Sequence, residues 1–290
     1  MDASFYLIQV LNGVQYGFLL FLVASGLTLV FGVMGVINLA HGSFFMIGAY
    51  LVYWLDGLLE SIFVALLLAI PLAIITGFVI ERIAIRFLYR RDHLDQVLLT
   101  YGLILIFNEA QRTLWGSDVH SVAPPTLLSG SISLTEDQQY PTYRLFISGI
   151  CLVVGAGLYA VIQRTKVGMR VRAASENPEI TQALGINSDR LFTFVFVAGA
   201  TLAAFSGMIA APVEAVYPGM GERVLIVSFV VVVIGGIGSI RGAFVGAMLI
   251  GLADAFGKAL LPEISGAMIY AVMAGVLVWR PKGLFYRGIT

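Results

Sequence analysis

Long apolar segments alternate with short polar ones along the whole chain. A helix needs about 20 mostly apolar residues to cross a hydrocarbon core about 30 Å thick. Against that length the sequence shows nine candidate spans, at residues 5–33, 41–56, 62–80, 95–111, 145–163, 192–214, 222–238, 242–260 and 267–279. Because backbone polar groups find no water partners in lipid, each span is expected to be α-helical. The pattern predicts an all-α integral membrane protein with a single transmembrane domain over residues 1–290.

Three places in this pattern predict departures from simple crossing. The second and last spans are short, and glycines break the region Gly235–Gly242. One or two of these segments are therefore candidates for re-entrant or half-helices. We expect about nine transmembrane or partly re-entrant helices, within a range of 8–10.

The composition agrees with a chain whose main solvent is lipid. Of its 290 residues, 59% are hydrophobic and 12% are charged, against about 45–50% and about 25% in soluble domains. The net charge is zero, which gives no reason to expect a nucleic-acid partner. The only cysteine, Cys151, lies in an apolar run and excludes an intrachain disulfide. No basic segment precedes the first apolar run, so we expect that span to be retained rather than cleaved.

Lysines and arginines fall mostly on one side of the predicted membrane. If the spans alternate in direction, thirteen of the 17 share one side, namely Arg82, Arg86, Arg90, Arg91, Arg164, Lys166, Arg170, Arg172, Arg190, Arg241, Arg280, Lys282 and Arg287. The other side carries Arg112, Arg144, Arg223 and Lys258. Cytoplasmic loops hold the excess of basic residues. The sequence thus predicts an external N-terminus, a cytoplasmic C-terminus, an external loop at 112–144 and a cytoplasmic loop at 164–191.

The external loop is long enough to do more than join two helices. It contains Pro124 and Pro125, several serines and threonines, and the acidic pair Glu136 and Asp137. A polar loop of this kind is either a simple connector or a surface on which another molecule lands, and the residues alone leave both open.

The cytoplasmic loop carries the signals of a short helix. Asn177 is a favourable N-cap, and Pro178 suits the first helical position. Glu179 complements the positive end of the helix dipole. Gly185 can adopt the left-handed conformation that ends a helix. We therefore expect a helix of about two turns in this loop.

Ile180, Ala183 and Leu184 form the apolar side of this short helix. Two turns between two membrane spans cannot bury such a face alone, so these residues need a partner surface. One interpretation is a protein on the cytoplasmic side. The alternative is an interfacial helix that rests on lipid headgroups.

Three stretches of the chain resemble a known permease family. They are GLTLVFGVMGVINLAHGSFFMIGAY at Gly26–Tyr50, the segment from Arg172 to Asn187, and GGIGSIRG at Gly235–Gly242. The chain is similar to the LivH-type branched-chain amino acid permeases of ATP-binding-cassette importers, and the likeness covers essentially its whole length. One departure is that the general permease signature places a glycine shortly after Glu-Ala-Ala. Here two alanines follow Arg172 and the next glycine is Gly185, so that signature cannot be mapped position by position.

The resemblance implies a transport subunit of a bacterial inner membrane and not an enzyme. It implies a second homologous permease in a heterodimer, two cytoplasmic ATPases that bind ATP and Mg, an extracytoplasmic substrate-binding protein and the lipid bilayer as partners, with no cofactor in this chain. It also implies that the short cytoplasmic helix docks on an ATPase, through Asn177, Pro178, Glu179, Ile180, Ala183, Leu184 and Gly185. The implied solute is a branched-chain or other hydrophobic amino acid. The same architecture importing urea, short amides or aromatic acids is the alternative.

Polar residues at membrane depth are costly and tend to face a water path or the bundle interior. The densest set lies near the cytoplasmic face of the predicted topology and provides the candidate pathway or gate residues Thr28, Asn38, His41 and Ser43. His41 either lines a gate or simply bonds a backbone carbonyl at the turn between the first two spans. With 3 histidines and 1 cysteine in the chain, we expect no metal site.

Glycines mark helix breaks and close packing. The segment His41–Phe44 is echoed by Arg241–Phe244, and each opens a helix after a glycine-containing break. Broken helices at matching positions occur in transporters built from duplicated halves. The residues assigned to helix breaks or packing are Gly42, Gly235, Gly236, Gly238 and Gly242, with Gly13 and Gly17 as a further packing seam.

Missing motifs limit the other functional classes. The chain has no G-x-x-x-x-G-K-[ST] phosphate loop, so ATP hydrolysis would fall to another chain. A stand-alone channel or ion-coupled carrier would need ionisable residues near the bilayer centre, where this sequence has almost none. Asp254 and Lys258 are four residues apart towards the external end and are expected to pair. An intramembrane enzyme would need a His/Asp/Glu cluster or a Ser/His pair that the pattern does not provide.

Overall fold

The described chain is almost entirely helical. The computed structural model describes residues 3–89, 91–135 and 138–285, so Arg90, Glu136, Asp137 and Arg287 lie outside it. The nine longest helices of the described part are α1 (Ala3–Met34), α2 (His41–Leu59), α3 (Ile62–Ile83), α4 (His93–Trp115), α5 (Thr142–Arg164), α8 (Ser188–Ala210), α9 (Met220–Gly235), α10 (Ile240–Leu260) and α11 (Ser265–Trp279). Each corresponds to one of the nine predicted spans.

Within the described residues, seven segments are both long enough and apolar enough to cross a membrane. They are α1, α2, α3, α5, α8, α10 and the segment Pro262–Trp279, which joins η3 (Pro262–Ile264) to α11. Helix α9 has only 16 residues, and α4 carries charged residues such as Asp95 and Glu109. The all-α membrane fold is confirmed, while the number of helices that cross the membrane stays a prediction.

Two predicted spans end later than the helices do. The span predicted at 192–214 is α8, which begins four residues earlier because Asn187 caps it, and which ends before Pro212. Proline has no backbone N–H to donate to the carbonyl four residues before it, so it cannot continue the helix. The span predicted at 222–238 is α9, which ends at Gly235 because Gly236 turns the chain with φ of +94°. Both corrections follow from local backbone chemistry at the helix end.

A small β-hairpin, which was not predicted from the sequence, lies in the loop 112–144. Strand β1 (Ser131–Thr135) pairs antiparallel with β2 (Gln138–Pro141), with the first residue of β1 opposite the last of β2. The alternation of polar and apolar residues in β1 was the available signal. The same loop is joined to the segment after α8 by two backbone hydrogen bonds between His120 and Val216, of 2.8 and 2.9 Å.

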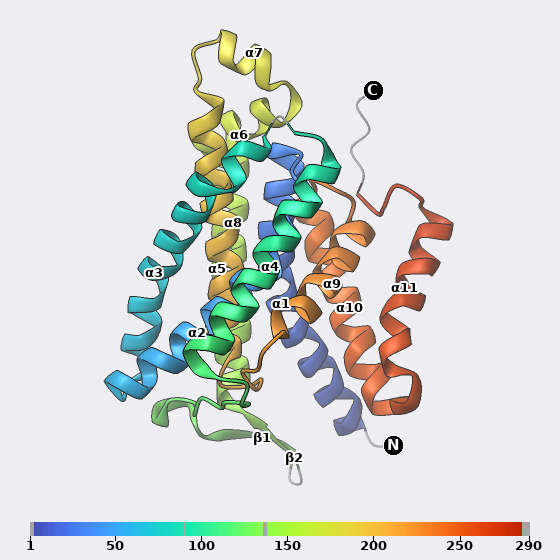
Figure 1. Ribbon diagram of the computed structural model, residues 1–290. Helices are drawn as coiled ribbons and strands as arrows, with labels where there is room; N and C mark the ends of the chain where they lie inside the picture. The colour runs from blue at the N-terminus through green and yellow to red at the C-terminus, as the bar shows by residue number, and fades with distance from the viewer. Residues whose placement is uncertain (1–2, 90, 136–137, 286–290) are drawn as a thin grey trace.

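Helix α1 is the centre of the bundle. It packs against α5, α8, α9 and α10, and both α2 and α3 pack against α8. In Figure 1, α1 starts at the bottom of the bundle near the hairpin, whereas α11 finishes towards the top. Two short helices, α6 (Lys166–Glu176) and α7 (Pro178–Ala183), lie at that top end. The first and last long helices thus have their free ends on opposite sides, and which side faces the cytoplasm stays a prediction.

Glycines bring neighbouring helices into backbone contact. Gly13 and Gly17 of α1 face α10 so closely that a Cβ added to Gly13 would stand 2.9 Å from the Leu252 Cα. Gly242 of α10 lies against Gly235 of α9 in the same way. This is the close packing that the glycine pattern predicts, and it stabilises a bundle in lipid through van der Waals contact.

We expect Gly48→Ala to lower the free energy of unfolding by about 1–3 kcal/mol. A Cβ at Gly48 of α2 would overlap the backbone of Ala204 in α8, which cannot move aside as a flexible side chain can. The measurement is denaturant unfolding in mixed micelles. The matched control is Gly57→Ala in the same helix, where a Cβ meets nothing within 4 Å. That variant should be neutral or slightly stabilised, because alanine favours helix, and an equal loss in both would contradict the packing account.

Candidate functional site

The short helix predicted from the sequence lies at the tip of the loop between α5 and α8. Helix α7 spans Pro178–Ala183, and the Asn177 Oδ1 accepts a hydrogen bond from the Ile180 N–H at 3.0 Å. Gly185 follows with φ of +83°, and its N–H donates to the Gln182 carbonyl at 2.9 Å. The N-cap, the first-turn proline and the terminating glycine therefore lie where the sequence places them.

The outer side of α7 is apolar and largely exposed. Ile180 is 59% exposed and Leu184 is 77% exposed, whereas Thr181 on the other side is buried. Glu179 and Ala183 are exposed as well. In Figure 1, α7 is the outermost element at its end of the bundle. Two large apolar side chains on such a projection indicate a contact surface for another molecule, and its occupation by an ATPase stays a prediction.

Helix α6, which was not predicted from the sequence, supports α7. It follows Thr165, whose Oγ1 accepts a hydrogen bond from the Gly168 N–H at 3.1 Å. Gly168 lies against the carbonyl of Ile162 in α5, and Arg172 donates a hydrogen bond to that carbonyl. The buried positions of α6 are residues 168, 171 and 174, and this helical spacing was the signal from which α6 could have been predicted. Helix α6 thus ties the short helix to the end of α5.

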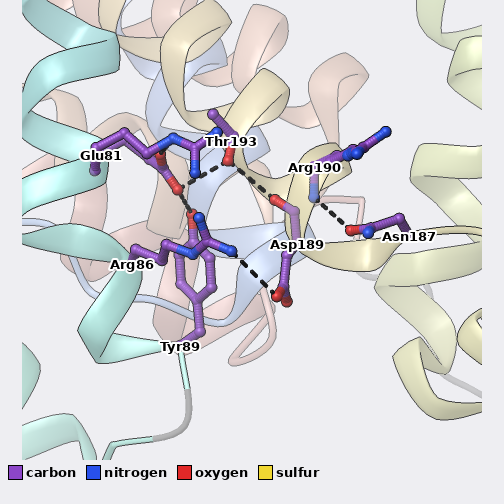
Figure 2. A network of polar contacts seen from close by, with 8 residues as sticks. Glu81, Arg86, Tyr89, Asn187, Asp189, Arg190 and Thr193 are labelled. Carbon is purple, nitrogen blue, oxygen red and sulfur yellow. Dashed lines mark hydrogen bonds and ion pairs between the residues drawn. The ribbon is translucent and has the colours of Figure 1, made fainter.

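A buried carboxylate joins α3 to α8 at the base of the loop (Figure 2). The Glu81 side chain is fully buried in the last turn of α3. Its Oε1 accepts hydrogen bonds from the Tyr89 hydroxyl and, at 2.9 Å, from the Thr193 hydroxyl of α8. Its Oε2 lies 3.7 Å from the Nε of Arg82. Burial and the hydrogen bond to Glu81 raise the pKa of Tyr89, so this hydroxyl remains protonated and donates.

An ion pair and a helix cap complete this connection. Arg86, in the short helix η1 (Ile85–Leu88), places its Nη2 at 3.6 Å from the Asp189 Oδ2 at the start of α8. The Asn187 Oδ1 accepts a hydrogen bond from the Arg190 N–H at 3.0 Å and so caps α8. The sequence named Arg86 and Arg190 only among the basic residues of one side and Asn187 only as the end of a resembling segment, and it predicted none of these contacts. The signal for Glu81 was an acidic residue at the end of an otherwise apolar span.

The four candidate pathway residues are buried inside the single chain: Thr28, Asn38, His41 and Ser43. The His41 Nε2 lies 3.1 Å from the Val23 carbonyl, eleven residues before the end of α1. That is about 16 Å along the helix. The turn was predicted near the end of the bundle, but it lies inside the bundle. The reason is that residues 35–40 are not helical and fold back before α2 begins. The carbonyl contact is the structural alternative for His41, and a gate stays a prediction.

The repeated glycine segments contact the same helix. Gly42 lies against Gly221 at the start of α9, and Gly242 lies against Gly235 at the end of α9. Gly238, with φ of +81°, turns the chain between α9 and α10. The two similar segments, His41–Phe44 and Arg241–Phe244, therefore each contact α9 through a glycine. The contacts between α2, α9 and α10 thus lie apart from α7, which is at the tip of the bundle (Figure 1).

Comparison with known proteins connects this architecture to a family. The family model described as "Branched-chain amino acid transport system / permease component" matches residues 9–277. The chain belongs to this permease family. Members of the family are membrane components of transporters and not catalytic subunits, so the permease is assigned to the transport class.

Curated relatives match this permease over nearly its whole length. BraD of Pseudomonas aeruginosa, a high-affinity branched-chain amino acid transport system permease protein, is 33% identical over 97% of this chain and 96% of its own. LivH of Escherichia coli K12, described in the same words, is 30% identical over 98% of this chain and 96% of its own. LivM of the same strain is 25% identical over 89% of this chain and 66% of its own. No solved structure matches the permease.

Charges of both signs also gather at the opposite end of the permease. The predicted pair of Asp254 and Lys258 is confirmed, with the Nζ of Lys258 2.6 Å from the Oδ2. Glu214, in the segment after α8, lies in the field of Arg223, Lys258 and Asp254. Burial raises the pKa of the Glu214 carboxyl, and the two cations oppose that shift. Sequence reasoning noted the pair but could not bring Glu214 and Arg223 to it, because the chain turns between α8 and α9.

Proposed function

We propose that this permease imports branched-chain or other hydrophobic amino acids as one subunit of an ATP-binding-cassette importer in a bacterial inner membrane. It forms the translocation path together with a second, homologous permease. Two separate ATPases bind ATP and Mg and hydrolyse the nucleotide. An extracytoplasmic binding protein delivers the solute, and this chain needs no cofactor of its own.

The relatives support the solute and the second permease. BraD, LivH and LivM are each described as permease proteins of a high-affinity branched-chain amino acid system. LivH and LivM come from one strain, and both resemble this chain. Two different but related permeases in one organism are what a heterodimeric translocation path requires.

The exposed apolar side of α7 is the observation that carries the proposal. An apolar pair at the tip of a loop, held by capping and by α6, is suited to insert into a groove of a soluble partner. The same end of the bundle carries basic residues on α6 and the end of α5, namely Arg164, Lys166, Arg170 and Arg172. Basic excess favours the cytoplasmic side, where the ATPases act.

The connection at the loop base gives a route for the motion. When the ATPases close on ATP, α7 moves with the surface it is bound to. Helix α6 is fixed to the end of α5, and Glu81 holds α3 to α8, so these helices move with the loop rather than independently of it. Rigid connections of this kind turn a local movement into a rotation of packed helices. The path between the two permeases then opens to one side at a time.

The test is uptake into proteoliposomes that contain this permease with its second permease, ATPases and binding protein. We expect labelled leucine to accumulate only when ATP is present on the side that carries the ATPases. Accumulation should stop when the ATPases are left out. Urea and aromatic acids are assayed in parallel. Uptake by this chain alone, without ATPases, would establish a channel or carrier instead, and selective uptake of urea or an aromatic acid would replace the proposed solute.

A further inference from the structure

A polar hollow of about 270 Å³ lies beside the Glu81 connection at the loop end of the bundle. Its lining residues come from the end of α3, from η1 and from the start of α8, and they are Arg82, Arg86, Asn187, Asp189, Arg190 and Thr193. Three of the six are arginines and one is an aspartate. With Asp189 and the adjoining Glu81 counted against the three arginines, the hollow keeps an excess of one positive charge.

The three arginines are not equally engaged. Arg86 is held by its ion pair with Asp189. Arg82 is about half exposed and lies 3.7 Å from the buried Glu81. No hydrogen bond or ion pair joins the Arg190 guanidinium to a described residue, and in Figure 2 this side chain reaches away from Arg86 and Asp189. Arg82 and Arg190 therefore keep N–H groups free for an external anion, and guanidinium favours phosphate as a partner.

Exposed aromatic side chains continue from the two arginines along the membrane helices. Phe78 is one turn before Arg82 in α3, and the Arg82 Cζ lies 5.1 Å from the centre of its ring. Phe194 is one turn after Arg190 in α8 and is exposed. Residues four apart share a helix face. Each arginine thus stands above an apolar stripe on a helix long and apolar enough to cross the membrane.

We propose that this hollow binds the phosphate headgroup of an anionic phospholipid, with Arg82 as the donor beside Glu81, Arg190 as a second donor at the edge of the hollow, and the acyl chains along Phe78 and Phe194. Basic hollows between membrane helices on the cytoplasmic side recognise anionic lipid headgroups through this combination of charge and adjoining apolar surface. The exposed aromatic residues favour a lipid over an acidic protein side chain, because they face the medium that surrounds the helices. Asn187 and Asp189 also line the hollow, so a headgroup bound there would lie at the end of the loop 164–191.

Lipid titration of the full-length permease tests the site. Dioleoyl phosphatidylglycerol is added to the purified chain in detergent, and bound lipid is counted by native mass spectrometry. Dioleoyl phosphatidylcholine has the same acyl chains without net charge, and we expect it to bind more weakly. Arg82→Gln and Arg190→Gln should each weaken phosphatidylglycerol binding by about fivefold. The matched control Arg170→Gln, an exposed arginine of α6 at the same end, should change it less than twofold.

Lysine variants separate loss of charge from loss of fold. Arg82→Lys and Arg190→Lys keep the charge and should retain more binding than the glutamine variants. Equal binding of the two lipids, or equal effects of Arg82→Gln and Arg170→Gln, would overturn the proposal. Binding of inorganic phosphate as tight as that of phosphatidylglycerol would assign the site to a soluble anion and overturn the lipid. If Arg82→Gln and Arg190→Gln left lipid binding unchanged but abolished co-purification of the ATPases, the lipid proposal would also be overturned. The hollow would then be a contact site for a protein.

Discussion

Ile180→Asp and Leu184→Asp are each expected to abolish co-purification of the ATPases with the permease while membrane insertion stays intact. Both side chains are large, apolar and more than half exposed, Ile180 in α7 and Leu184 at its C-cap. A docked interface of this kind depends on a few buried apolar anchors, each of which contributes about 2 kcal/mol or more. Burying a carboxylate in place of such an anchor adds a desolvation cost. Affinity should therefore fall by more than a hundredfold and ATP-driven uptake with it.

The matched control is Gln182→Asp. Gln182 is exposed on the same short helix but faces away from Ile180 and Leu184. We expect this variant to retain the ATPases and most of the uptake. Affinity pull-down from solubilised membranes measures the association, and protease protection in intact vesicles reports insertion. Normal ATPase recovery with Ile180→Asp would refute the docking role of α7 and leave the interfacial-helix alternative.

The helices and the short α7 were predictable because their signals are local. Apolar runs of membrane length fixed all nine long helices to within a few residues, and the cap at Asn177 with its following proline located α7. The predicted helix ends were wrong where a single residue stops the helix although the hydropathy of its neighbours would continue it. Pro212 ends α8 early, and the positive φ of Gly236 ends α9. A hydropathy average cannot register either effect.

The loop-base connection was not predictable because it depends on distance in space. Glu81 and Thr193 are 112 positions apart in the chain and meet only because α3 packs on α8. The depth of His41 was misjudged for a similar reason. A turn between two spans is expected at the membrane surface, but here residues 35–40 return along α1 to Val23 before the next helix starts. Sequence patterns give elements and their ends, whereas the contacts between elements need the fold.

Glu81→Ala is expected to uncouple transport and to lower the free energy of unfolding by about 1–3 kcal/mol. The substitution leaves the Tyr89 hydroxyl without its acceptor, and an orphaned donor costs about 1–3 kcal/mol. The Thr193 hydroxyl loses its link to α3 but keeps the Asp189 carbonyl of its own helix as an acceptor at 3.0 Å. Because α7 is unchanged, the ATPases should still co-purify. Uptake should fall at least tenfold while basal ATP hydrolysis continues, since α3 no longer follows α8. Unfolding in mixed micelles and the ratio of solute moved to ATP hydrolysed measure the two effects.

Two further variants show whether hydrogen bonds or charge hold these helices. Glu81→Gln keeps an acceptor oxygen for both hydroxyls and should lose only about 1 kcal/mol, with uptake largely retained. The matched control is Glu109→Ala, which removes a carboxylate from an exposed pair with Arg112 at 3.7 Å. Exposed pairs contribute about 0–1 kcal/mol, so this variant should behave as wild type. If Glu81→Gln lost as much as Glu81→Ala, an acceptor oxygen alone would not hold the Tyr89 and Thr193 hydroxyls, and the connection of α3 to α8 would depend on the negative charge of Glu81.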